Sequence, residues 1–154
     1  MFSSSYWQDF DEIWRFEECS ELLENVKLGS VVFFNRDQSN ALWTMLISKK
    51  IRHLMHNTIY NNIFTNVEKY ELSFDNKGSA NVLFERFLER AGVPDILFLF
   101  FSINSACVLR FSLLREFWNE IFLPSDETTI AIDINSKTVL YSFEECFFIG
   151  TKPA

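Results

Sequence analysis

The sequence predicts an α+β fold: a single domain over residues 1–154, with several helices packed against a mostly antiparallel sheet and a C-terminal β-hairpin. Two observations lead to this prediction. Segments with helical periodicity lie among segments with strand-like alternation, without the strict strand–helix–strand order of a parallel sheet. The 154 residues are 48% hydrophobic and 17% aromatic, which is enough to bury one sizeable core, and no repeat or Pro/Ser-rich linker divides them.

The clearest helix is expected over residues 80–91. Its apolar side chains recur on one broad face, as they do in a helix that packs against a core. Ser79 is the expected N-cap, because its hydroxyl can accept a hydrogen bond from a backbone N–H of the first turn. Gly92 and Pro94 then end the helix.

Three further helices are expected. One covers residues 110–122, where apolar residues recur at i, i+3, i+7 and i+10 before Pro124 stops the helix. An acidic helix covers residues 17–27. A short helix is placed over residues 55–64, in a stretch whose apolar residues fit neither period cleanly.

Strands are marked by β-branched and aromatic runs between turn residues. One such run is apolar except for Ser102, as in a central strand covered on both faces, and another alternates polar and apolar residues, as in a half-buried strand. The turn signal Asn135-Ser136-Lys137 separates the last two runs and predicts the hairpin. The expected strands are residues 31–35, 41–48, 68–74, 96–103, 128–134 and 138–143.

The charge and glycine content exclude several classes of function. There are 21 acidic and 14 basic residues, a formal net charge of −7, whereas nucleic-acid affinity depends on clustered Lys and Arg. The basic cluster over residues 49–53 is interpreted as a solvated face. Only 4 glycines accompany 18 phenylalanines, and no phosphate-loop, dinucleotide, hydrolase or metalloprotease motif is present. We therefore expect a protein that acts through its surface, is not an enzyme and does not bind nucleic acid directly.

The cysteines and the N-terminus indicate a compartment. Cys19, Cys107 and Cys146 are odd in number and lack C-x-x-C spacing, so they are expected to be reduced thiols. The N-terminus has no basic region of the kind that begins a signal peptide. The longest apolar run, residues 96–101, is far shorter than the ~20 residues that span a bilayer. The expected location is the cytoplasm, with no membrane partner.

The two histidines are the main candidates for other chemistry. His53 and His56 are at i, i+3 spacing, but asparagines rather than carboxylates follow them, so no metal and no cofactor is expected. A small cytosolic enzyme that pairs one of these histidines with Cys107 is the alternative function. A structural or adaptor subunit that dimerises through exposed aromatic side chains is a second alternative.

Acidic residues gather near both ends of the chain. The first 26 residues contain seven acidic side chains and one basic side chain, Arg15. They suggest a landing surface for a basic protein, with solubility as the alternative explanation. Tyr6, Trp7 and Trp14 lie among these acids and could anchor a partner, although a core position is favoured for both tryptophans. The expected partner-binding residues are Asp11, Glu12, Glu17, Glu18, Glu21, Asp126, Glu127, Glu144 and Glu145.

The last third of the chain resembles a known family. FWNEIFLPSDET at residues 117–128, IAID at 130–133 and YSFEE at 141–145 are similar to the ending of bacterial immunity proteins, the antidotes to contact-dependent growth inhibition (CDI) and related polymorphic toxins. In that ending a helix with a Trp leads into Pro-Ser-Asp, a hairpin with a paired acid, and a final apolar strand. The resemblance implies a cytosolic protein without catalysis that binds and blocks the C-terminal domain of a cognate toxin, expected to be a basic nuclease. No contact residue is carried over from the family, and a monomer or weak dimer is expected.

Overall fold

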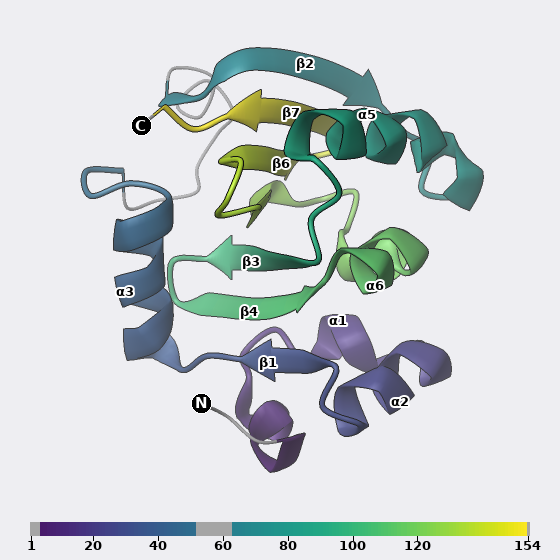
Figure 1. Cartoon of the computed structure of the whole chain (residues 1–154). Coiled ribbons are helices and arrows are strands. Elements are labelled where there is room, and N and C mark those ends of the chain that lie inside the picture. Colours follow the sequence, from purple (N-terminus) through teal and green to yellow (C-terminus); the bar gives the residue numbers. More distant parts are fainter. Residues whose placement is uncertain (1–3, 52–62, 154) are drawn as a thin grey trace.

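The computed structural model describes residues 4–51 and 63–153 and contains a seven-stranded sheet in which every neighbouring pair is antiparallel (Figure 1). The strand order is β1-β4-β3-β5-β6-β7-β2. The α+β class, the antiparallel sheet and the C-terminal hairpin are thereby confirmed. The strands are β1 Val31–Phe33, β2 Thr65–Glu71, β3 Ile96–Ser102, β4 Ser105–Arg110, β5 Glu127–Ile132, β6 Thr138–Phe143 and β7 Cys146–Thr151.

Two of these strands were not predicted from periodicity, and β2 begins earlier than expected. β4 follows β3 through a tight turn in which Ser102 pairs with Ser105. β7 was expected only as the final apolar strand of the family resemblance, and it pairs with β6 along its whole length. β2 covers Thr65–Glu71 rather than residues 68–74, with a register shift between Thr65 and Glu68.

The helices are η1 Ser4–Asp9, α1 Trp14–Glu17, α2 Ser20–Lys27, α3 Arg36–Leu46, η2 Lys77–Ala80, α5 Asn81–Ala91, α6 Phe111–Glu116 and α7 Trp118–Ile121. The helix expected over residues 17–27 corresponds to α2, preceded by the separate turn of α1. The helix expected over residues 110–122 is broken at Phe117, whose φ of −115° and ψ of 25° leave the helical region. Nearly all of the short helix expected over residues 55–64 lies outside the described residues.

α5 confirms the clearest helix prediction, but not its cap. Gly92 ends the helix in the left-handed conformation, with a φ of 75°. Ser79 is not the N-cap: its hydroxyl donates to the carbonyl of Ser73 and accepts from the N–H of Ser73, both at 3.0 Å. Ala80 takes the cap position without a side-chain hydrogen bond, so Ser79 fixes the preceding loop instead.

The strand expected over residues 41–48 is wrong, because this segment belongs to α3. Asn35 and Gln38 form a reciprocal capping box that starts the helix. Ser39 and Trp43, four residues apart, then face the sheet and are fully buried. The local helix-start signal therefore decides the conformation of this segment.

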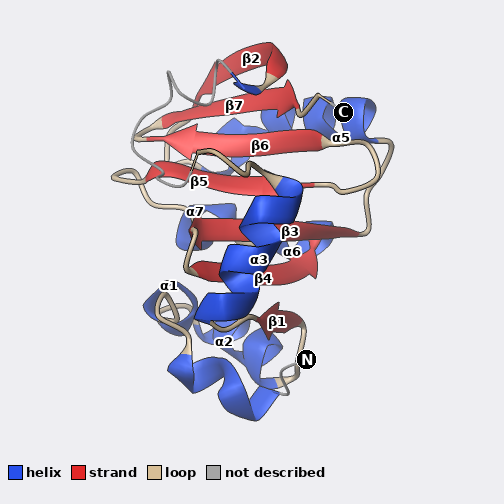
Figure 2. Cartoon of the chain, turned by 90° about the vertical axis from the view of Figure 1, so that its left-hand side faces the viewer, coloured by secondary structure: helices blue, strands red, loops and turns tan. Residues whose placement is uncertain are grey.

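The helices cover the two faces of the sheet unequally (Figure 2). The helical face carries Leu97, Leu99 and Leu109 and is covered by η1, α1, α2, α5, α6 and α7. The α3 face carries Phe100 and Ile130, and α3 crosses it. The high phenylalanine content fills these layers, because buried aromatic rings each contribute a large apolar area to the core. In the described part of the chain, no helix is long and apolar enough to cross a lipid bilayer.

Candidate partner-binding site

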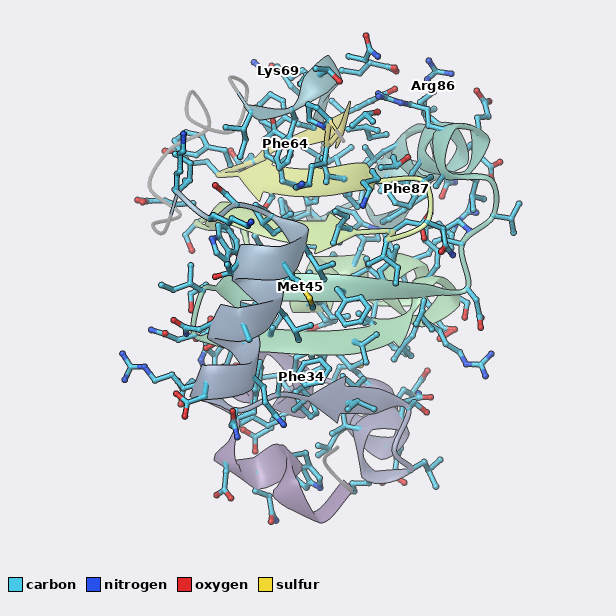
Figure 3. The ribbon with its side chains drawn as sticks, turned by 60° about the vertical axis from the view of Figure 1, so that its left-hand side comes forward. Phe34, Met45, Phe64, Lys69, Arg86 and Phe87 are labelled. Atoms are coloured by element: carbon cyan, nitrogen blue, oxygen red, sulfur yellow. The ribbon has the colours of Figure 1, made fainter. Side chains whose placement is uncertain are left out.

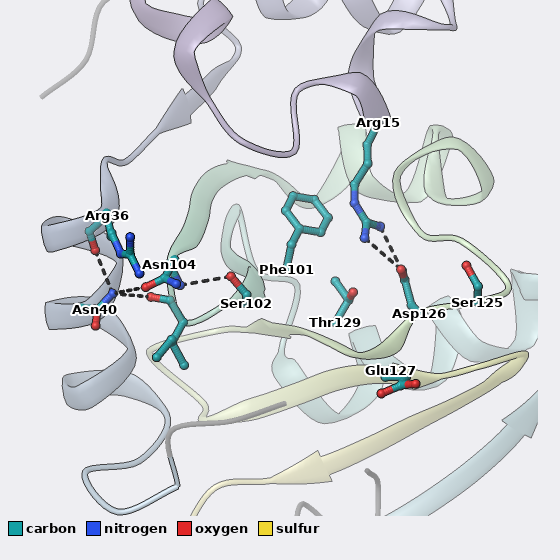
Figure 4. Close-up of a pocket in the computed structure, with 11 residues that line it drawn as sticks. Arg15, Arg36, Asn40, Phe101, Ser102, Asn104, Ser125, Asp126, Glu127 and Thr129 are labelled. Carbon is teal, nitrogen blue, oxygen red and sulfur yellow. Dashed lines mark hydrogen bonds and ion pairs between the residues drawn. The ribbon is translucent and has the colours of Figure 1, made fainter. Parts of the chain in front are cut away.

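A buried ion pair joins the N-terminal segment to the loop before β5 (Figure 4). Arg15 donates from both terminal nitrogens to the two carboxylate oxygens of Asp126, at 3.0 and 2.9 Å. The side chains are only 6% and 5% exposed. A bidentate Arg–carboxylate pair in this geometry fixes both position and orientation. We call these two residues the clamp.

The remaining polar atoms of the clamp are also satisfied. Arg15 Nε donates to Glu12 at 3.0 Å, and one terminal nitrogen donates to the carbonyl of Ile121 at 3.0 Å. Asp126 accepts a further hydrogen bond from the backbone N–H of Leu123 at 2.9 Å. The guanidinium lies 4.3 Å from the ring centroid of Phe101. Because its groups are paired, the clamp can remain buried without an uncompensated charge.

The clamp brings together segments that lie 111 residues apart in the sequence. Ser102 pairs with Ser105, and Glu127 pairs with Phe143, so the β3–β4 turn, the start of β5 and the β6–β7 turn all lie at one end of the sheet. We call this the clamp end. The opposite end is where β3 begins and β4 finishes, with Ile96 paired to Arg110.

The acids near the hairpin occupy different environments at the clamp end. Glu127, Glu144 and Glu145 are exposed. Glu144 and Glu145 form the two-residue β6–β7 turn, in which Glu144 has a left-handed φ of 57° and donates its N–H to the carbonyl of Asp126. Asp126 itself is 6% exposed, so its prediction as a surface residue that meets a partner is wrong. Its carboxylate turns inward because Arg15 and the Leu123 N–H bind it there.

One of the N-terminal acids lies at the clamp end. Glu12 is half-buried and bonds Arg15, which places it directly beside the clamp. Asp11, Glu17, Glu18 and Glu21 are exposed on the loop and on α1 and α2, which flank Arg15 in sequence. The structure therefore brings Glu12 to the same end of the sheet as the hairpin acids.

Trp14 is the exposed aromatic residue of this region. Its side chain is 45% exposed, whereas Trp43 and Trp118 are almost fully buried, so the core position favoured for Trp14 is wrong. The ring is held by the guanidinium of Arg15, 5.0 Å from its centroid. Trp7 is half-buried and packs against the core, in agreement with its favoured core position. The side chain of Tyr6 lies outside the described part.

A hollow of about 630 Å³ opens at the clamp end (Figure 4). Its wall is fixed by Asn40, whose side-chain nitrogen donates to the Ile103 carbonyl at 3.0 Å and to Asn104 Oδ1 at 2.8 Å. Two arginines and two acids among its lining residues balance in formal charge. The lining residues are Arg15, Arg36, Asn40, Phe101, Ser102, Ile103, Asn104, Ser125, Asp126, Glu127 and Thr129.

Sequence reasoning did not identify the residues that build this hollow. Arg36, Asn40 and Asn104 belong to no motif, and only their tertiary positions bring them together. Arg15 had a signal, because it is the one base among the seven acids of the first 26 residues.

The environment of Cys107 is the opposite of what a nucleophile needs. Its side chain is fully buried, and this burial raises the pKa of the thiol. Cys19 and Cys146 are half-buried free thiols. His53 and His56 lie outside the described residues. Within residues 4–51 and 63–153, no three His, Cys, Asp or Glu side chains form a group that could hold a metal ion.

No protein-family model, curated protein or solved structure matches this chain. The resemblance to immunity proteins therefore rests on the residues quoted for it.

Proposed function

We propose that this chain is a cytoplasmic immunity protein that binds and blocks the toxic C-terminal domain of a cognate CDI-type toxin. The observation that carries the proposal is the clamp, because it brings Glu12 of the N-terminal segment to the end of the sheet where Glu127, Glu144 and Glu145 are exposed. The resemblance of residues 117–145 to the ending of immunity proteins supports the same functional hypothesis.

The expected partner is a basic nuclease domain. A nuclease holds phosphates with Lys and Arg, and an acidic surface attracts the same side chains. Complementary charge accelerates the encounter of two proteins and penalises wrong partners. The net charge of −7 and the exposed acids Glu127, Glu144 and Glu145 suit this role.

Charge alone gives little affinity, and Trp14 supplies the apolar contact. Tryptophan is enriched among the residues that dominate binding energy, particularly where its orientation is fixed beforehand. Trp14 is 45% exposed and its ring rests against the guanidinium of Arg15. We expect it to enter an apolar pocket of the toxin domain whose rim carries Lys or Arg.

The proposal predicts a gene for a large secreted protein with a basic C-terminal domain just upstream, and it is tested by expressing this chain together with that domain. Growth should be restored, the two purified domains should form a stoichiometric complex, and nuclease activity should fall in proportion to occupancy. Growth arrest that this chain does not relieve, in the absence of any complex, would contradict the proposal. A measured turnover that disappears when His53 and His56 are both replaced would favour the enzyme alternative instead.

A further inference from the structure

The two edges of the sheet differ in length and cover. β1 is an edge strand of three residues, and η1 packs against it (Figure 1). β2 is an edge strand of seven residues, and no strand in the described part of the chain pairs with its outer side. The unpaired N–H and C=O groups of such an edge are a template for another strand.

The second half of β2 is regular and carries opposite charges. The irregularity in the pairing of β2 with β7 is confined to the first half, where the register shifts between Thr65 and Glu68 and Asn66 has a left-handed φ of 53°. From Glu68 onward the strand pairs with β7 without interruption. Lys69 and Glu71 are two residues apart in the strand and so project from the same face of the sheet. Their side chains are 56% and 80% exposed, and Figure 3 shows Lys69 on β2 at the edge of the sheet.

The charge sequence selects one register for pairing of β2 with itself. In an antiparallel two-fold pair centred on Glu68, Lys69 or Glu71, the central residue faces its own copy and places like charges opposite each other. In the pair centred on Tyr70, Lys69 of each copy faces Glu71 of the other. This register therefore has two opposite-charge pairs and no facing like charges.

The register centred on Tyr70 also suits the side chains of β2 on the helical face of the sheet. Tyr70 faces its own copy there, and aromatic residues form favourable cross-strand pairs. Glu68 would not be an unpaired charge in this β2–β2 interface, because Arg86 Nε donates to both of its carboxylate oxygens, at 2.7 and 2.9 Å. This ion pair and the neighbouring Arg90 lower the pKa of Glu68, so the carboxylate keeps its charge and its arginine partner.

We propose that β2 pairs with β2 of a second copy of this chain, antiparallel and centred on Tyr70, to form a dimer whose two sheets are continuous. The paired segment is short, so the dimer is weak and depends on concentration rather than being permanent. The inference concerns the β2 edge and does not depend on the proposed toxin.

Sedimentation equilibrium of the purified chain, from micromolar to millimolar concentration, tests the proposal. Lys69→Glu and Glu71→Lys should each weaken self-association about tenfold, because two facing pairs change from opposite to like charge. An equimolar mixture of the two variants should recover the wild-type association constant as a heterodimer, and the double exchange Lys69→Glu/Glu71→Lys should recover it as a homodimer. Asp95→Lys is the matched control, because Asp95 directly precedes β3 and lies away from the β2 edge. It should leave self-association unchanged.

Hydrogen exchange of backbone amides gives a second readout that does not depend on variants. Exchange in β2 should slow as the concentration rises, whereas exchange in β1 should not change. A wild-type chain that remains monomeric at millimolar concentration would overturn the proposal, as would single variants that associate like the wild type. If β2 becomes protected only when the toxin domain is added, the edge belongs to that partner and the self-pairing is wrong.

Discussion

The two ends of the sheet carry the same kind of ion pair in opposite environments. At the clamp end, Arg15 and Asp126 form two short hydrogen bonds, and their side chains are only 6% and 5% exposed. At the opposite end, a terminal guanidinium nitrogen of Arg110 lies 3.7 Å from Asp95 Oδ1, and the two side chains are 69% and 78% exposed. Water already solvates the second pair, whereas each partner of the first pair depends on the other. Arg–Asp pairing therefore supports the structure at the clamp end, while the charges at the opposite end remain available to solvent.

The largest expected effect is the loss of the buried pair. Arg15→Met should lower the free energy of unfolding by about 3–5 kcal/mol, because it leaves the carboxylate of Asp126 buried without a cation. Arg110→Met, the matched change at the opposite end, should lower it by less than ~1 kcal/mol. Urea denaturation followed by circular dichroism measures both. The double variant Arg15→Met/Asp126→Leu should recover part of the loss, and equal effects of the two single variants would refute the contrast between the ends.

The next effect concerns the aromatic residue beside the clamp. Trp14→Ala should weaken binding of the proposed toxin domain by ~2 kcal/mol, about thirtyfold, because it removes the proposed apolar anchor. Met45→Ala, which truncates an apolar side chain on α3 that is 69% exposed, is the control and should bind as the wild type does. Isothermal titration calorimetry gives both affinities. A wild type that binds and a Trp14→Ala variant of equal affinity would show that the anchor lies elsewhere, while the proposed function would stand.

A smaller effect is expected from the exposed charges at each end. Glu144→Lys/Glu145→Lys should slow association with the toxin domain about tenfold at low salt, and the difference should shrink as salt is added. Asp95→Lys/Glu116→Lys places the same charge change near Arg110 at the opposite end. Stopped-flow measurement of the association rate compares the pairs. If both double variants slow association equally, net charge rather than the clamp end steers the partner.

The smallest effects concern two buried serine hydroxyls, of which one has a hydrogen-bond partner and the other has none among the described residues. Ser39 and Ser142 are both fully buried, but Ser39 Oγ accepts a hydrogen bond from the Ala106 N–H at 3.0 Å, whereas Ser142 Oγ has no partner among the described residues. Ser142→Ala should leave stability unchanged or raise it by up to ~1 kcal/mol, because it removes an unsatisfied hydroxyl. Ser39→Ala should lower stability by ~1 kcal/mol. Thermal unfolding of the two variants distinguishes them, and a larger loss for Ser142→Ala would indicate a missing partner.

Elements with a local cause could be predicted from the sequence. The β5–β6 hairpin is one of them, because Asp133 accepts from the backbone N–H of Asn135 and of Ser136 and so closes the turn within a few residues. The end of α5 is another, since Gly92 adopts a left-handed conformation that suits glycine. The capping box of Asn35 and Gln38 is an equally local signal for α3, but the apolar residues that follow it fit neither the helical nor the strand period cleanly.

The candidate site depended on contacts that no local pattern contains. Asp126 is an acid after Pro124 and Ser125, which is typical of an exposed turn, and only the arrival of Arg15 from 111 residues away makes it a buried residue. The exposure of Trp14 follows from the same contact, because Arg15 points inward and its neighbour is left at the surface. The excess of acids could be predicted from the sequence, but the position of Glu12 at the same end of the sheet as the hairpin acids could not.

The pairing pattern has a consequence for synthesis on the ribosome. Among the described residues, β1 and β2 both pair with strands that are synthesised later: β1 pairs with β4, and β2 pairs with β7. The β3–β4 hairpin is the first piece of sheet that a growing chain can form, and Arg15 meets its carboxylate only after Asp126 has left the exit tunnel. A nascent chain therefore cannot complete the clamp end of the sheet until translation has passed β7.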